Sequence, residues 1–111
     1  MRVDLVVDGD CSLPTEVQIA FYRITQEALN NIVKHARASQ AQVHLVCRSG
    51  LVELMISDDG VGFNPQSITS HRLGLEIMRE RAQDVDAGFK IDSQPDIGTR
   101  ISVMWQESKE G

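Results

Sequence analysis

The stretch AQVHLVCR-SG-LVELMISD, residues 41–58, contains two apolar runs joined by a Ser-Gly pair. This pattern predicts a β-hairpin, in which two strands are joined by a short turn. Side chains alternate between the two faces of a strand, so the three aliphatic residues at 52, 54 and 56 share a face with Asp58. A carboxylate in phase with buried aliphatic side chains is costly unless it finds donors. Asp58 is therefore the first candidate binding residue.

Upstream of the hairpin, the sequence predicts a strand and a long helix. Residues 2–7 (RVDLVV) are typical of a strand, and Pro14 suits the first turn of a helix that runs to about Arg37. The apolar positions of that helix recur at steps of three and four residues, which predicts one buried stripe. They are Val17, Ala20, Phe21, Ile24, Ala28, Leu29 and Ile32.

Downstream of the hairpin, a polar loop (DGVGFNPQSITSHR) precedes a second helix and two further strands. The helix is marked by Leu75, Met78, Ala82 and Val85, and the strands are FKIDS (89–93) and RISVMWQ (100–106). The order β, α, β-β, loop, α, β-β predicts a single α+β domain over residues 1–111. We expect two layers, with the helices on one face of the sheet.

Composition limits the classes of function. The chain has 111 residues, 11 Lys and Arg, and 16 Asp and Glu, for a formal net charge of -5. We therefore expect no nucleic-acid partner, and an anionic ligand would need local neutralisation. The apolar runs are far shorter than the ~20 residues that span a bilayer. With no apolar signal-peptide stretch at the start, we expect a cytoplasmic location and reduced, buried thiols at Cys11 and Cys47 rather than a disulfide.

Four small groups of residues are candidates for binding chemistry. Glu27, Asn31 and the Lys34-His35 pair lie along one side of the first helix, where carboxylate and amide oxygens one turn apart can share a hard cation such as Mg²⁺. Taken alone, this group is more typical of a solvated helix face, because polar helix flanks are common.

The other three groups contain glycines. In the turn after Asp58, Gly60 and Gly62 allow a flat ring to approach the backbone, although such turns are common. Gly74 and Leu75, at the expected start of the second helix, would leave free amides for an anion, or form a plain junction. Gly98-Thr99 precedes the last predicted strand and has little specificity alone.

Together, in this order, the four groups resemble the ATP-binding catalytic domain of sensor histidine kinases, in the gyrase, Hsp90, histidine kinase and MutL superfamily. The corresponding segments are YRITQEALNNIVKHA (22–36), DDGVGF (58–63), LGLEIMRERA (73–82) and Gly98-Thr99. The pairing of QEALNN with MRERA is similar to the nitrate-sensor-like kinases. The resemblance covers roughly residues 3–105 and implies a Bergerat fold, a mixed sheet backed by helices.

The resemblance also implies roles for these residues. Asn31 would ligate Mg²⁺ on the phosphates of ATP, Glu27 would orient water or act as a base, Lys34 would lie near phosphate, and His35 beside the ribose or ring. Asp58 would accept the adenine N6 amine, helped by Gly62 and by Thr99 through water. Residues 64–73 would form the ATP lid. Arg72 stands where many relatives have glycine and would either stiffen the lid or place a guanidinium near the γ-phosphate, and Asp96 replaces a glycine of the last motif.

The implied activity is transfer of the γ-phosphoryl group of Mg-ATP to a histidine in a separate helical domain, for relay to a response regulator. None of His35, His44 and His71 has the setting of an acceptor, so we expect the chain to bind ATP without autophosphorylation. We also expect this piece to be a monomer, the whole kinase a homodimer, and any membrane anchor to lie in other segments. The alternatives are an anti-sigma-factor serine kinase of the same superfamily and a non-catalytic, nucleotide-gated binding module.

Overall fold

Five strands form one mixed sheet in the order β1-β2-β3-β5-β4. The computed structural model describes residues 2–10, 12–36, 38–60, 69–94 and 98–107. The strands are β1 (Arg2–Asp8), β2 (Gln40–Arg48), β3 (Leu51–Asp58), β4 (Gly88–Gln94) and β5 (Gly98–Gln106). Strand β1 pairs with β2 in parallel, and the other three pairings are antiparallel. The predicted hairpin is confirmed as β2 and β3.

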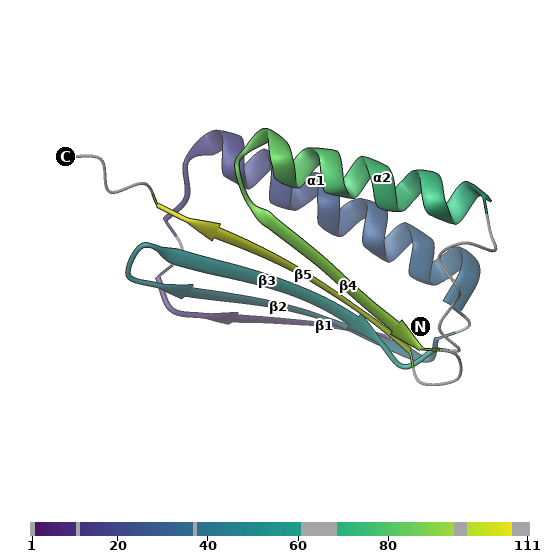
Figure 1. The fold of residues 1–111 in the computed structure, drawn as a ribbon. Coiled ribbons are helices and arrows are strands. Elements are labelled where there is room, and N and C mark those ends of the chain that lie inside the picture. Colours follow the sequence, from purple (N-terminus) through teal and green to yellow (C-terminus); the bar gives the residue numbers. More distant parts are fainter. Residues whose placement is uncertain (1, 11, 37, 61–68, 95–97, 108–111) are drawn as a thin grey trace.

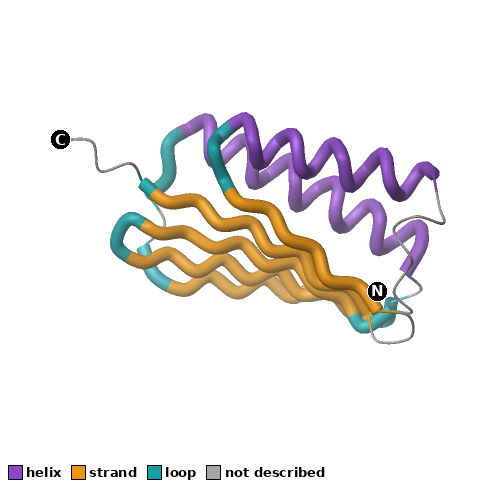
Figure 2. Tube along the Cα trace, viewed as in Figure 1, coloured by secondary structure: helices purple, strands orange, loops and turns teal. Residues whose placement is uncertain are grey.

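Two helices lie side by side on the same face of this sheet (Figures 1 and 2). They are α1 (Thr15–Asn31), which continues into a π-helical turn, η1 (Ile32–Ala36), and α2 (Thr69–Asp84). The predicted α+β fold with two layers is confirmed. No helix in the described part of the chain is both long and apolar enough to cross a membrane.

The core consists of rows of side chains that cross the sheet on its helix-covered face. Register places Leu5, Val43, Ile56, Ile101 and Ile91 in one such row. The helices close over the middle of it with their apolar stripes, because both stripes recur with helical spacing. The buried helix residues are Val17, Ala20, Phe21, Ile24, Ala28 and Ile32, then Leu75, Met78 and Ala82. Both predicted stripes are therefore confirmed, with Leu29 and Val85 partly buried at their margins.

The first helix changes geometry at its end. Residues 15–31 are α-helical, but residues 32–36 form a π-helical turn within the stretch that we predicted as one helix. A π turn inserts an extra residue per turn and is frequent at functional sites. Pro14 provides the N-cap position of α1 without a side-chain hydrogen bond, in agreement with the predicted start.

The second helix begins earlier than predicted. We placed Gly74 at the junction of loop and helix, but α2 starts at Thr69, so Gly74 and Arg72 lie inside it. A free-amide anion site at Gly74 is therefore wrong, since its N–H lies beyond the first turn. The missing side chain at Gly74 instead lets α2 lie close to Glu27 and Asn31 of α1.

The last strand also begins earlier than predicted, at Gly98 rather than Arg100. Gly98 has a φ of 122°, a conformation that favours glycine, and a Cβ there would collide with the carbonyl oxygen of Asp58. Glycine at position 98 therefore lets the start of β5 lie close to the backbone at the end of β3. Asp96 lies outside the described residues.

The expectation of reduced thiols is wrong for Cys47, which is buried and disulfide-bonded. The chain turns at Gly9, where φ is 92°, and a Cβ at that position would collide with the carbonyl oxygen of Cys47. The turn therefore brings the backbone after β1 against β2, which sequence separation alone did not reveal. Cys11 lies outside the described residues.

Candidate functional site

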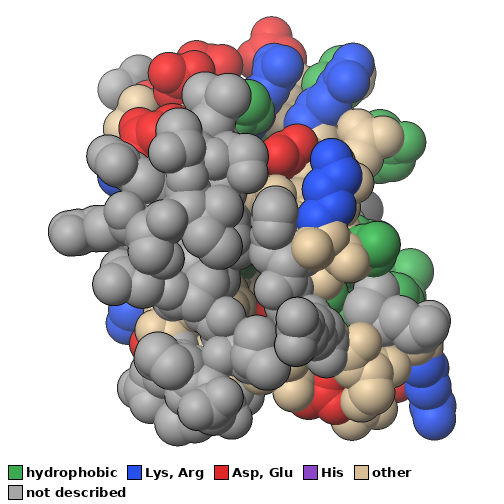
Figure 3. All heavy atoms as spheres, turned by 90° about the vertical axis from the view of Figure 1, so that its right-hand side faces the viewer, with side chains coloured by type: hydrophobic (Ala, Val, Ile, Leu, Met, Phe, Trp, Pro, Cys, Tyr) green, Lys and Arg blue, Asp and Glu red, His purple; other side chains and the backbone are tan. Residues whose placement is uncertain are grey.

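Most of the predicted site residues that the structure describes lie at one end of the molecule. Strand β3 ends there at Asp58 and β5 begins there at Gly98, while α1 and η1 end and α2 begins at the same end (the right-hand end in Figure 1). Side chains of both charges surround this end in the view that looks onto it (Figure 3). The fold thus brings together motifs that are spread over some seventy residues of sequence.

Asp58 lies in a row across the sheet whose members on β3, β5 and β4 are polar, whereas its members on β1 and β2 are apolar. Register places Val3, Ala41, Asp58, Thr99 and Ser93 side by side on the strands. The predicted inward phase of Asp58 is therefore confirmed, because the same face carries the buried Ile56 row. This row is the last one before the sheet ends.

Only one of the two oxygens of the Asp58 carboxylate has a hydrogen-bond partner among the described residues. Its Oδ1 accepts a hydrogen bond from the amide of Gly60 at 2.7 Å, whereas its Oδ2 is buried and has no partner among the described residues. Burial raises the pKa of Asp58, the Gly60 amide offsets part of that rise, and the nearby charge of Asp59 adds to it. A buried acceptor of this kind suits a ligand that brings its own N–H donor.

The hydroxyl of Thr99, which lies beside Asp58, is positioned by a residue on the neighbouring strand β4. Thr99 is buried, and its Oγ1 lies 2.8 Å from Oγ of Ser93 on β4. The pair fixes where the Thr99 hydroxyl sits relative to Asp58, its register partner on β3. Ser93 was not among the predicted site residues, and its position opposite Thr99 in a hairpin is the signal that could have found it.

Glu27 and Asn31 converge on Gly74 from the facing helix. A Cβ built on Gly74 would lie 2.7 Å from Oε1 of Glu27 and 2.9 Å from Nδ2 of Asn31. Asn31 is 8% exposed, and its Nδ2 has no hydrogen-bond partner in the described part of the chain. A buried amide without a partner is unfavourable by itself. The Nδ2 of Asn31 could donate to a phosphate oxygen, and its amide oxygen is of the kind that Mg²⁺ accepts as a ligand, so Asn31 fits a magnesium-bound phosphate.

The remaining predicted residues are placed only in part. Lys34 lies in η1 and its side chain is exposed. Leu75 lies in α2 and its side chain is buried in the core. His35 lies in η1 and Arg72 in α2, but their side chains are outside the described part of the structure. Gly62 and residues 64–68 of the predicted lid lie outside the described residues. The prediction that residues 69–73 also belong to a loop is wrong, because they form the first turns of α2.

Asp59 has a role that the sequence did not indicate. Its carboxylate accepts hydrogen bonds from the amides of Ser39 and Gln40, at 2.9 and 3.0 Å, and from the hydroxyl of Ser39. These bonds, led by the one from the Ser39 hydroxyl, hold the pKa of Asp59 below its usual value. The only sequence signal was a second aspartate out of phase with the strand.

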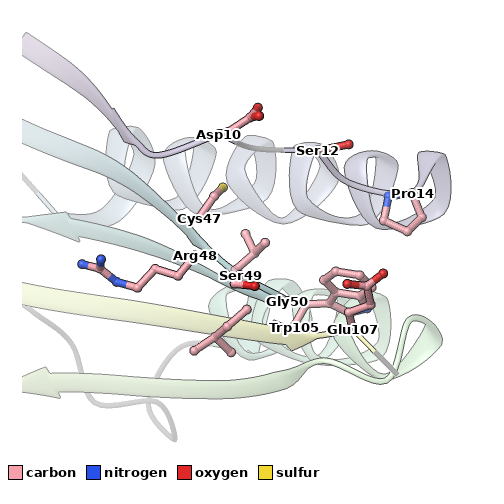
Figure 4. Close-up of a pocket in the computed structure, with 11 residues that line it drawn as sticks. Asp10, Ser12, Pro14, Cys47, Arg48, Ser49, Gly50, Trp105 and Glu107 are labelled. Atoms are coloured by element: carbon pink, nitrogen blue, oxygen red, sulfur yellow. The ribbon is translucent and has the colours of Figure 1, made fainter. Parts of the chain in front are cut away.

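A separate pocket of about 390 Å³ lies at the opposite end of the molecule (Figure 4). It is formed by the turn between β2 and β3, the start of α1 and Trp105. None of the predicted site residues lines it. The pocket is therefore distinct from the site built around Asp58.

The chain is thus a two-layer α+β domain with a half-buried carboxylate, Asp58, at the end of the core face and a buried amide, Asn31, on the facing helix. Residues 16–109 match the family described as histidine kinase-, DNA gyrase B- and HSP90-like ATPase. The chain belongs to this family.

Within the family, the chain is similar to sensor kinases. It is 39% identical over 101 residues to the sensor protein VraS of Staphylococcus aureus strain COL, covering 91% of this chain and 29% of that protein. The VraS protein of Staphylococcus saprophyticus is also 39% identical, over 98 residues that cover 88% of this chain and 28% of that protein. The chain thus spans less than a third of the length of these relatives.

Solved structures agree on the fold. The ATP-binding domain of PrrB from Mycobacterium tuberculosis has a TM-score of 0.71 and 26% identity, covering 98% of this chain and 82% of that one. The blue-light-activated histidine kinase of Erythrobacter litoralis EL346 has a TM-score of 0.76 at 24% identity, covering 99% of this chain and 37% of that one. The chain is a histidine kinase-type ATPase domain with the mixed sheet expected from its sequence.

Proposed function

We propose that this chain binds Mg-ATP at the Asp58 end of the sheet and is the catalytic domain of a two-component sensor histidine kinase. It would donate the γ-phosphoryl group to a histidine in a separate helical domain, for relay to a response regulator in the cytoplasm. The observation that carries the proposal is the buried Oδ2 of Asp58, which lacks a partner among the described residues. The adenine N6 amine supplies the missing donor.

The same acceptor provides base selectivity. Guanine presents a carbonyl oxygen where adenine has its amine, so the Asp58 carboxylate would face another acceptor. Sites built around a hydrogen bond discriminate strongly against ligands that leave their buried polar groups unpaired. The hydroxyl pair of Thr99 and Ser93 limits how the base can tilt in this site, because it occupies the neighbouring positions of the row.

The phosphates would lie toward α1 and α2. Asn31 would hold Mg²⁺, which neutralises the triphosphate and the charge that develops as the β–γ bridging bond breaks. Glu27, next to Asn31 over Gly74, would orient water or the incoming nucleophile. Lys34 adds a positive charge at the exposed edge, which a chain of net charge -5 needs to attract an anion.

The transfer itself is a simple exchange of bonds. A nitrogen of the acceptor imidazole bonds to the γ-phosphorus, the bond to the β–γ bridging oxygen breaks, and ADP leaves with that electron pair. Most of the catalysis is positioning and neutralisation of charge. The described His44 lies on β2 with its Nε2 2.7 Å from Asp8 Oδ2, away from Asp58. We therefore expect no phosphorylation of this chain by itself, and transfer when a helical histidine domain is added.

Calorimetric titration of the 111-residue chain with ATP and GTP, with and without Mg²⁺, tests the proposal. We expect Mg-dependent binding that favours ATP. Asp58→Asn should weaken ATP binding by about 1–3 kcal/mol, the range for a hydrogen bond to a charged group. Asn31→Ala should remove the dependence on Mg²⁺ instead. The control is Asp92→Asn, on the exposed part of β4. Parent-like ATP binding by both site variants would refute the assignment.

A further inference from the structure

Asp59 ties together segments that are far apart in sequence. Its Oδ1 accepts from the amides of Ser39 and Gln40, and its own N–H donates to the carbonyl oxygen of Gln40 at 3.3 Å. The carbonyl oxygen of Ser39 in turn accepts from the amide of Arg2 at 3.1 Å. The Asp59 carboxylate thus continues the β2–β3 ladder one step past Asp58, in place of a backbone carbonyl.

The segments joined in this way carry the two halves of the proposed site. Ser39 follows shortly after η1, which extends the helix that bears Glu27 and Asn31. On the other side, Asp59 stands between Asp58 and Gly60, the acceptor and donor of the 2.7 Å bond that orients the Asp58 carboxylate. A shift of residue 59 therefore moves Asp58 and Gly60 together, relative to the end of η1.

Burial does not account for the conformation of Asp59, because its side chain is exposed. An exposed carboxylate that accepts three hydrogen bonds is held by those bonds alone. The same bonds keep its pKa low, so the carboxylate is charged at neutral pH. Its oxygens are thus available as acceptors at neutral pH.

We propose that Asp59 is a positioning residue for nucleotide binding. Through Ser39 and Gln40, it sets the Asp58 carboxylate relative to the helix that carries the phosphate-binding residues. This inference rests on the proposed ATP site and adds to it a residue that does not touch the nucleotide. It predicts that the loss of an exposed side chain weakens binding at a buried site.

The test compares Asp59→Ala with Asp59→Asn in the 111-residue chain. The alanine variant should raise the dissociation constant for Mg-ATP roughly tenfold, as expected for losing bonds to a charged acceptor. It should also speed hydrogen exchange at the amides of Ser39, Gln40 and Gly60. The asparagine variant keeps an Oδ1 that can accept from both amides, so it should restore most of the affinity and the protection.

Asp92→Ala is the matched control, since Asp92 is an exposed aspartate on β4. Ser39→Ala removes only the hydroxyl donor and should have a smaller effect in the same direction. Trp105 fluorescence checks that each variant is folded. Unchanged affinity and exchange in Asp59→Ala, or no rescue by asparagine, would overturn the positioning role.

The two readouts separate this inference from the proposed function. A folded parent chain that does not bind ATP would contradict the ATP site, and with it the effect on affinity. The exchange rates would still report whether Asp59 holds the turn. Tight ATP binding by both the parent and Asp59→Ala would leave the proposed function intact and refute the role of Asp59 alone.

Discussion

At the scale of single residues, Asp58 links function to a cost in stability. Its folded-state pKa is raised, mainly by burial, above the ordinary value of 3.8. For an acid with a raised folded-state pKa, the favourable contribution is complete below pH 3.8. It is lost as pH rises through the folded-state value. At neutral pH the charged Asp58 carboxylate therefore lowers the free energy of unfolding, although a ligand needs this charged form.

This lowered stability gives a prediction for the protein without nucleotide. Asp58→Asn should lose less unfolding free energy than the parent between about pH 4 and pH 7, because it cannot ionise. Urea unfolding at a series of pH values measures the difference. Asp59, whose pKa is lowered, loses its stabilising effect only at lower pH, so it does not disturb this window. Parallel pH profiles for parent and variant would contradict the assignment of the raised pKa.

At the scale of elements, Gly74 is where the two helices meet over the site. Alanine would favour the helix by up to about 1 kcal/mol at an ordinary position. Here its Cβ would press on Glu27 and Asn31, at 2.7 and 2.9 Å from their polar atoms. We expect Gly74→Ala to be no more stable than the parent. We also expect it to lose most of the Mg²⁺ dependence of ATP binding.

Calorimetry with and without Mg²⁺ measures that loss, and thermal unfolding measures stability. Gly88→Ala is the control, because a Cβ at Gly88 would meet only an ordinary contact at 3.9 Å. If Gly74→Ala kept the parent's Mg²⁺ dependence, Asn31 would not be held by this contact.

The elements also explain how much the sequence could predict. Strong periodicity located β2, β3 and the stripe of α1, because burial imposes a period of two or of 3.6 on side chains. It did not locate the start of α2, since the polar residues from Thr69 onward show no apolar spacing. It also did not detect η1, because the predicted apolar stripe ends at Ile32, which is the first residue of η1.

The candidate site was predictable where the strand phase was decisive and not elsewhere. The inward position of Asp58 could be predicted from its phase in the strand. Asp59, in contrast, bonds to Ser39, which lies 20 residues away and is not connected to it by any local pattern. Ser93 requires the register of β4 against β5. Strand register depends on long-range packing, which short-range sequence patterns do not contain.

At the scale of the whole molecule, burial falls steeply across the sheet toward β1. Within one row, Ile56 at the centre is 1% exposed, whereas Leu5 on β1 is 69% exposed. Ile56→Ala should cost about 2–5 kcal/mol of unfolding free energy. Leu5→Ala should cost about 0.5 kcal/mol or less, as expected for a surface position.

Denaturant unfolding of the two variants provides the comparison, since both remove aliphatic carbon from the same row. An equally large loss for Leu5→Ala would mean that the exposed face of β1 is covered in solution. Dilution would then reveal whether a second copy provides the cover, because only that loss would depend on protein concentration.

The parallel pairing of β1 with β2 also bears on how the chain folds. The β2–β3 hairpin needs only a two-residue connection, and hairpins form in roughly 1–10 μs. Strand β1, in contrast, reaches β2 only after the chain has passed through the whole of α1 and η1. Contacts between residues so far apart are slow to form, because the entropy of closing the loop opposes them first. The hairpin is therefore suited to start the folding of the sheet, and β1 to be the last strand added to it.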